Sequence, residues 1–376
     1  MTRFLSVLLL TVLVSGVPRS SALELRGQAS AISVWDLDHT AVWQWIVRYI
    51  PTLTGGFAGS SVSLDGALSL NTRWMGHMKG SGVRSESGDL SLYRGWIRFT
   101  TPRFECRVGR QKISFGSAAM LRPLMWFDRI DPRDPLQITE GVNAILFRYY
   151  FMNNTNIWFW GLGFNTEVKG WEVFPSAGGR PELGGRIQTP LLKGEFAVTC
   201  HYRTADLSRG TGGLFLGDRI EGENRFGLDG KWDAKVGLWF EAVWIHLPGP
   251  DFLPPWQRLV TVGADYTFGL GNGLHVMSEY FEVRAVERAF DRGEGMRFSA
   301  LSLNYPLGFL DRITGMLYFD WEHREWYRFI NFQRTLDQWQ FFIMGFWNPD
   351  AFQIYTTRDI NLFAGKGIQV MAVFNH

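Results

Sequence analysis

Basic side chains recur at spaced positions in the sequence between residues 94 and 148. Several alternate with apolar residues, as Arg94 and Arg98 do with Ile97 and Phe99. Alternate residues of a β-strand share one face, so such side chains would gather on one surface. Guanidinium and ammonium groups gathered in this way attract anions and do not form an acid–base pair. The predicted cationic surface comprises Arg94, Arg98, Arg107, Arg110, Lys112 and Arg148.

A long charged segment follows this basic strand, at residues 117–140. It contains three prolines and the apolar run Leu124, Met125, Trp126 and Phe127, which would be unfavourable in a loop surrounded by water. We therefore predict a loop that folds inward. Its charged residues are Arg122, Asp128, Arg129, Asp131, Arg133, Asp134 and Glu140. The acids could face the basic surface across a narrow aperture and select permeants by charge, or they could form salt bridges that hold the loop. Both interpretations can hold together.

The elements that must position these residues are β-strands with period-two alternation. The alternation is clear at residues 62–74, 195–203, 225–232, 312–321 and 367–374. Several strands extend over 10 to 14 residues, whereas strands of a soluble sandwich usually have about 5–6 residues. A tilted strand that crosses a bilayer needs about 9–11 residues. We predict an all-β fold with a single transmembrane antiparallel β-barrel of about 18 strands, with 16 as the next choice.

Short and long connections alternate along the chain. The short ones are predicted at 101–103, 153–155, 190–193, 233–235, 269–272, 306–311 and 336–337. The long ones are predicted at 77–87, 117–140, 167–181, 205–224, 247–256, 284–295 and 348–365. Bacterial outer-membrane barrels have short periplasmic turns and longer outer loops, and this order is typical of them.

The first 22 residues resemble a secretory signal peptide, with Arg3 before an apolar run and small residues near position 22. An N-terminal membrane anchor is the alternative. Residues 23–376 would then form the barrel. The 17 Trp and 30 Phe suit an outward apolar band with aromatic girdles. A net charge of +2 does not favour nucleic acid as a partner.

The alternation changes phase within the basic strand. Phe104, Cys106 and Val108 share one face, whereas Ile113 and Phe115 belong to the other phase. A β-bulge near residues 109–110 would reset the alternation. It would turn Arg107, Arg110 and Lys112 to the barrel interior. An Arg or Lys that faces lipid at mid-depth costs about 2–4 kcal/mol, which is why we place the cations inside.

Enzyme and cofactor motifs are missing from the sequence. It has no zinc-binding or phosphate-binding motif, and its seven His form no cluster with metal-ligand spacing. A barrel hydrolase that uses His201 or His275 with Ser278 or Ser302 is the less favoured alternative, because Ser278 belongs to the apolar face. We expect no enzyme activity, no cofactor and no metal.

Three stretches carry a resemblance, namely RVGRQKISFG, LRPLMWFDRIDPRDP and EGV, between residues 107 and 142. They resemble the central region of bacterial outer-membrane porin-type barrels and are similar to alginate-export-type barrels. The resemblance implies Arg107, Arg110, Gln111 and Lys112 as pore-wall residues and residues 128–134 as part of the loop. Such barrels usually end in an aromatic residue that the assembly machinery recognises, whereas this chain ends in His376.

These observations predict a channel in the cell outer membrane for passive diffusion of small hydrophilic, anionic or sugar-like solutes. The alternative is an exporter of an anionic polysaccharide, for which few acids should face the interior. The predicted inward acids Asp65, Glu195, Asp229, Asp265, Glu279 and Asp320 favour the channel. The expected partners are outer-membrane lipid, lipopolysaccharide, the barrel assembly machinery, small solutes and further copies of the chain.

Overall fold

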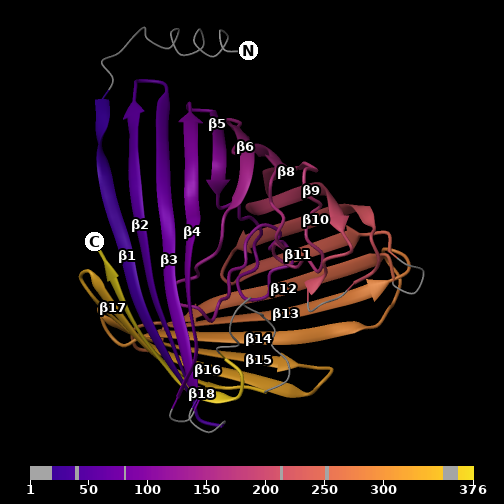
Figure 1. Cartoon of the computed structure of the whole chain (residues 1–376). Helices are drawn as coiled ribbons and strands as arrows, with labels where there is room; N and C mark the ends of the chain where they lie inside the picture. The colour runs from indigo at the N-terminus through magenta and orange to yellow at the C-terminus, as the bar shows by residue number, and fades with distance from the viewer. Residues whose placement is uncertain (1–18, 39–41, 80–81, 212–214, 250–253, 350–362) are drawn as a thin grey trace.

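The computed structural model describes residues 19–38, 42–79, 82–211, 215–249, 254–349 and 363–376, and within them the chain forms one closed antiparallel β-barrel (Figure 1). Its 18 strands are β1 (Arg19–Asp36), β2 (Val42–Ala58), β3 (Ser63–Lys79), β4 (Gly82–Thr100), β5 (Phe104–Gln111), β6 (Val142–Tyr150), β7 (Asn156–Leu162), β8 (Glu182–Leu191), β9 (Gly194–Asp206), β10 (Ile220–Asp233), β11 (Gly237–His246), β12 (Trp256–Phe268), β13 (Leu274–Val286), β14 (Gly295–Pro306), β15 (Asp311–Asp320), β16 (Glu325–Leu336), β17 (Trp339–Trp347) and β18 (Lys366–Asn375). The predicted fold class and the choice of 18 strands are confirmed.

Each strand pairs with its neighbours in sequence, and β1 pairs with β18 to close the barrel. At the closure, the backbone N–H of Gly27 donates to the carbonyl of His376, and the N–H of His376 donates to the carbonyl of Gly27. The last residue of the chain is therefore part of the seam between β1 and β18.

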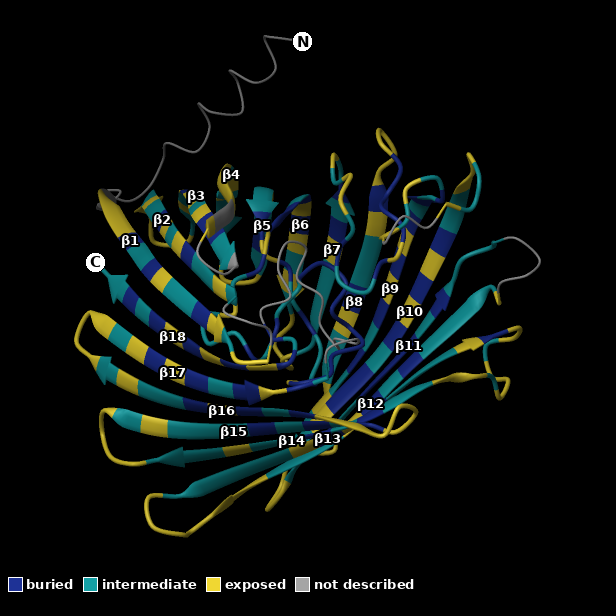
Figure 2. Cartoon of the chain, turned by 60° about the horizontal axis from the view of Figure 1, so that its bottom comes forward, coloured by how far each residue is buried: buried dark blue, intermediate teal, exposed yellow. Residues whose placement is uncertain are grey.

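The two faces of the barrel wall differ in polarity, as the exposure pattern along the strands shows (Figure 2). Large apolar side chains such as Leu238 and Val262 are exposed on the outside, whereas the neighbouring Thr261 faces inward and is fully buried. An apolar outer band with a partly polar interior is the pattern of a membrane-spanning barrel. The alternation predicted from sequence is confirmed.

The connections follow the predicted short and long order with two exceptions. Residues 77–87 were expected to form a long loop, but β3 continues to Lys79 and β4 begins at Gly82. That expectation is wrong, because the polar residues there pair as strand, with a register shift between His77 and Met78. At the same end of the barrel, β15 and β16 are joined by residues 321–324 alone.

The predicted bulge in β5 is also wrong. The ladder with β6 keeps one register from Phe104 to Gln111, and the ladder with β4 keeps one register from Glu105 to Arg110. The irregularity lies in β4, where Ser69 pairs with Arg94 but Leu70 pairs with Leu92, so that Tyr93 is the extra residue. In β5 itself, Gly109 has a φ of 122°, a conformation that only glycine adopts easily.

The predicted signal peptide falls almost wholly outside the described residues. Residues 19–22 belong to β1, and Arg19 and Ser20 pair with Ala58 and Phe57. Among the described residues, no helix is long and apolar enough to cross a membrane.

Candidate functional site

Residues 112–141 leave the end of β5, cross the barrel interior and return to β6 (Figure 2). Their contacts lie on the opposite wall. The carboxylate of Glu241 on β11 accepts hydrogen bonds from the N–H groups of Ala118 (2.7 Å) and Leu124 (2.9 Å). The hydroxyl of Thr261 on β12 donates to the carbonyl of Leu121 (2.6 Å).

A second glutamate makes the densest set of these contacts. Glu279 on β13 accepts from the N–H groups of Ala119 (2.7 Å), Met120 (3.0 Å) and Leu121 (2.6 Å). The indole N–H of Trp239 donates to it as well (2.9 Å). Glu241 and Glu279 are both buried. Backbone N–H groups of an irregular loop need acceptors when they are buried, and these carboxylates provide them.

Sequence reasoning missed this anchoring role and placed Glu279 among the acids facing the channel. The available signal was an inward acid between two apolar inward residues, Met277 and Phe281. A buried acid among apolar neighbours requires hydrogen-bond donors, and the loop is the element that supplies them.

Aromatic residues pack the loop against the wall. Phe115 stacks on Trp160 of β7 with ring centroids 5.5 Å apart, and it meets Trp126 and Phe127 edge-on. These residues belong to one buried apolar cluster that continues over the inner faces of β11 to β17. The apolar run at residues 124–127 is therefore buried inside the barrel.

Most of the loop charges pair within the loop. Arg122 lies 3.3 Å from Asp128, and Arg133 lies 2.7 Å from Asp131. Both pairs are buried. The guanidinium of Arg133 also lies 4.9 Å from the ring centroid of Phe363, and the backbone N–H of Arg129 donates to the hydroxyl of Thr139. These contacts match the interpretation in which salt bridges hold the loop.

Two loop acids instead face the basic wall. Glu140 is exposed and lies 3.8 Å from Arg110. Asp134 accepts the N–H groups of Leu136 and Ile138 and interacts electrostatically with Arg48 of β2. Burial raises the pKa of the Asp134 carboxyl, although the two N–H groups and Arg48 oppose the increase.

Three of the predicted cations meet at one acid near the short-turn end of the barrel. Glu105 lies 3.1 Å from Arg107, 3.6 Å from Arg148 and 4.0 Å from Arg98. Arg98 also forms a bidentate pair with Asp65 of β3. Arg148 stacks over Trp158, with the guanidinium carbon 3.8 Å from the ring centroid.

The other three predicted cations lie nearer to the loop. Arg94 donates to the carbonyl of Thr139 (2.8 Å) and interacts electrostatically with Arg110. Lys112 is exposed and interacts with Asp128. Gln111, implied as a pore-wall residue by the resemblance, is buried and donates to the carbonyl of Ala144 (3.0 Å).

Two further arginines extend this row and were missed from the sequence. Arg48 of β2 and Arg73 of β3 are cross-strand partners. Both point inward, because the flanking Val47, Tyr49 and Trp74 are exposed on the outer face. The signal was present, since both residues occupy the polar phase of an alternating strand. Inward arginines therefore continue from β2 to β6.

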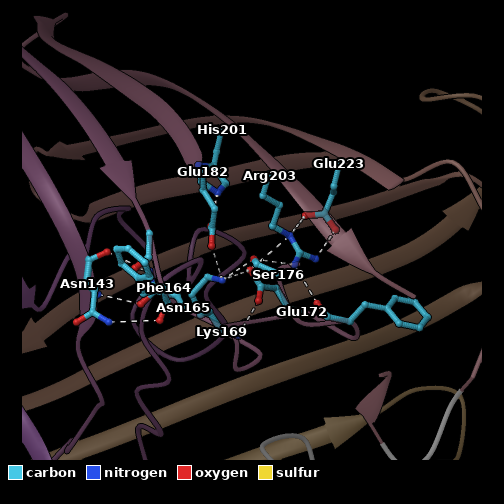
Figure 3. A network of polar contacts seen from close by, with 12 residues as sticks. Asn143, Phe164, Asn165, Lys169, Glu172, Ser176, Glu182, His201, Arg203 and Glu223 are labelled. Atoms are coloured by element: carbon cyan, nitrogen blue, oxygen red, sulfur yellow. Dashed lines mark hydrogen bonds and ion pairs between the residues drawn. The ribbon is translucent and has the colours of Figure 1, made fainter. Parts of the chain in front are cut away.

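A second inward loop, residues 163–181, joins the first. Its Trp171 donates to the carbonyl of Arg122 (2.7 Å). A buried charge network fixes it to the wall, in which Lys169 lies 3.0 Å from Glu182 of β8 and Arg203 of β9 lies 3.5 Å from Glu172 (Figure 3).

His201 joins the same network in one tautomer. Its Nδ1 accepts the indole N–H of Trp160 (3.2 Å), so Nε2 carries the proton and donates to Glu182 (3.1 Å). The His201 side chain is fully buried, and both of its ring nitrogens are hydrogen-bonded within this network. Ser278 is exposed on the outer face, as its strand phase predicted.

Comparisons with known proteins identify the fold. No protein-family model matches the sequence, and no curated protein is similar to it, so the predicted resemblance to alginate-export-type barrels stays a prediction. Among solved structures, OccAB1 of Acinetobacter baumannii is similar over 93% of this chain and 94% of its own, with a TM-score of 0.55 and 8% identity. OccK5 (OpdH) of Pseudomonas aeruginosa is similar over 94% and 98%, with a TM-score of 0.54 and 11% identity. OmpT, an outer membrane protein of Vibrio cholerae in its trimer form, is similar over 94% and 99%, with a TM-score of 0.52 and 11% identity. At these identities the likeness shows a shared barrel fold.

Proposed function

We propose that this chain is a channel of the bacterial outer membrane that lets small hydrophilic solutes diffuse passively and prefers anions. The observation that carries the proposal is the row of inward arginines on β2 to β6. It comprises Arg48, Arg73, Arg94, Arg98, Arg107 and Arg148. Because β5 has no bulge, Arg110 shares the phase of the exposed Val108 and is not counted in this row. The likeness to other outer-membrane barrels supports the location.

The charge balance along this row favours anions. Asp65, Asp89, Glu105, Asp134 and Glu140 contact or face the row, and Asp89 is the cross-strand partner of Arg73. The cations outnumber them, so the water beside the row has a positive potential. Two unit charges about 8 Å apart in water interact with about 0.5 kcal/mol, which changes a local concentration about twofold. Several such charges along one path therefore produce a measurable selectivity.

The alternative, export of an anionic polysaccharide, fits the structure less well. The sequence argument against export was that several acids face the interior and would repel a polyanion. Two of these acids do not face the open channel, because Asp229 pairs with Arg186 and Glu279 holds the loop. The crossing loop is the stronger objection. It is bonded to β11, β12 and β13, and it would have to detach before a thick polymer could pass.

The test is the reversal potential of the reconstituted barrel in a planar bilayer under a salt gradient. The wild type should prefer chloride over potassium. The double variant Arg48→Gln/Arg73→Gln should lower this preference about twofold or more. Arg334→Gln is the matched control, because Arg334 lies on the outward face of β16, between the exposed Ile330 and Leu336. A cation-selective wild type, or a double variant identical to it, would overturn the proposal.

A further inference from the structure

A set of basic residues lies on the outside of the barrel, at the end that carries the long loops. Each is within a few residues of that end of its strand. They are Arg258 of β12, Arg284 of β13, Arg297 of β14, Arg328 of β16 and Lys366 of β18. We call these five residues the outer cationic belt.

The outward direction of the belt follows from its neighbours. On β16, Trp326 and Ile330 are exposed, whereas Tyr327 and Phe329 face inward and are buried. Arg328 shares the phase of the exposed pair. Arg258 likewise shares the phase of the exposed Val262. These side chains therefore point away from the interior and its charge networks.

A tryptophan lies between two of the belt residues. Arg328 and Lys366 lie on the strands to either side of Trp347, and both pair with it in register. The Arg328 guanidinium lies 5.1 Å from the Trp347 ring centroid, and the Lys366 ammonium lies 5.2 Å from it. Trp347 is itself 56% exposed. Aromatic residues with this exposure mark the level at which a membrane meets water.

The acids at this level leave the belt with excess positive charge. Arg284 lies 2.7 Å and Arg258 3.5 Å from Glu282, and Arg297 lies 2.8 Å from Glu322. Lys366 lies 3.1 Å from Asp38. In the described part of the chain, no carboxylate lies within ion-pair distance of Arg328. Five cations thus meet three acids.

The outward arginine at the short-turn end of β16 has a counter-ion. Arg334 on the outward face of β16 lies 3.6 Å from Asp311 and forms a balanced pair with it. The same strand therefore has a compensated arginine at one end and an uncompensated one at the other. An uncompensated cation at the membrane boundary attracts anionic lipid headgroups, by about 1 kcal/mol for each Lys or Arg.

We infer that the outer cationic belt binds the phosphate groups of a phosphorylated glycolipid in the outer leaflet, with Arg328 and Lys366 as the central pair. Arginine suits this ligand because its planar fork donates two parallel hydrogen bonds to phosphate. The Trp347 ring between the two cations offers an apolar surface beside the sugar. Charge complementarity at the membrane boundary decides for a lipid over a soluble anion. This inference goes beyond channel function and does not depend on it.

The test measures the binding of purified lipid A to the detergent-solubilised barrel, with native mass spectrometry and Trp fluorescence as the two readouts. Wild type should bind lipid A, and enzymatically dephosphorylated lipid A should bind roughly tenfold more weakly or worse. The double variant Arg328→Gln/Lys366→Gln should show a loss of similar size. Inorganic phosphate at the same concentration should not compete, because it lacks the apolar anchor.

The matched control is Arg334→Gln, on the same strand and face but at the other end. It should bind lipid A like the wild type. Folding of each variant is checked by the mobility shift of heated against unheated barrel, and Lys366→Arg should keep binding. Equal binding of both lipid A forms, an unaffected double variant or an equally damaged control would each overturn the inference. Displacement of lipid A by inorganic phosphate would show instead that the belt is a site for soluble anions. Dimers that mass spectrometry detects in the wild type and not in the double variant would show that the belt binds a second copy of this chain.

Discussion

The substitution Glu279→Ala should release the first inward loop and increase the conductance of the channel. Glu279 accepts three consecutive backbone N–H groups of the loop, those of Ala119, Met120 and Leu121, together with the indole N–H of Trp239. Alanine offers no acceptor, so the three loop N–H groups and the indole N–H would lose their partner.

The size of the effect follows from the three loop contacts. Leaving a buried donor unpaired costs about 1–3 kcal/mol. The Trp239 indole belongs to the wall and loses its partner in either state of the loop, so only the three loop donors shift the equilibrium. Water that enters the site satisfies part of the loss, so the lower figure applies and three donors amount to about 3 kcal/mol. Every 1.4 kcal/mol is a factor of about ten in an equilibrium. The detached population of the loop should therefore rise by about two orders of magnitude.

Single-channel recording in planar bilayers measures this directly. Glu279→Ala should show larger and noisier conductance than wild type, and Glu279→Gln, which keeps one acceptor oxygen, should lie between them. Glu195→Ala is the matched control, because Glu195 is an exposed interior acid that pairs only with Gln188 among the hydrogen bonds of the described residues. A folded Glu279→Ala barrel with unchanged conductance and noise would refute the reasoning.

Three further outcomes are expected. Burial raises the pKa of Asp134, so its negative charge beside Arg48 and Asp131 is lost on acidification above the ordinary carboxyl range. Anion preference should therefore rise as the pH falls through the raised pKa of Asp134. Asp134→Asn should show, at pH 7, the anion preference that the wild type reaches only at low pH, and its reversal potential should lack this pH-dependent step. Gly109→Ala should lower the thermal stability of the barrel, measured by heat-dependent electrophoretic mobility, because the new Cβ would overlap the carbonyl oxygen of Gly95; equal mobility midpoints would contradict this. Arg203→Leu should cost about 3–5 kcal/mol in urea unfolding, because it leaves Glu223 and Glu172 buried without this partner, whereas the exposed Arg219→Leu should cost under about 1 kcal/mol.

The barrel could be predicted from sequence because its determinants are local. Period-two alternation depends only on the transfer energy of each side chain between a lipid-facing and an inward position, and every strand repeats it. The inward acids and bases of β3, β4 and β5 were assigned in the same way, and Asp65, Arg98 and Arg107 do lie together. Arg48 was missed only because Pro51 weakened the strand pattern around it.

The arrangement inside the barrel could not be predicted because its determinants are distant in sequence. The partners of Ala118 and Leu121 are more than a hundred residues away, and no period connects them. The bulge was placed in β5 because the phase of the sequence changes there. The phase changes because β5 ends at Gln111, so Ile113 and Phe115 belong to the loop and pack among its aromatic residues.

The two walls of the interior carry separate tasks, and this separation makes the proposals independently testable. The wall from β11 to β17 is largely apolar and is covered by the loop, which Glu241 and Glu279 hold. The wall from β2 to β6 carries the arginines, and Glu140 and Asp134 are the loop acids directed towards it. A variant at Glu279 should thus change conductance with a smaller effect on selectivity, whereas a variant at Arg48 should do the reverse. If both variants changed both quantities in the same proportion, the loop and the arginine row would form one mechanical unit, and the division of the interior into a holding wall and a selecting wall would be wrong.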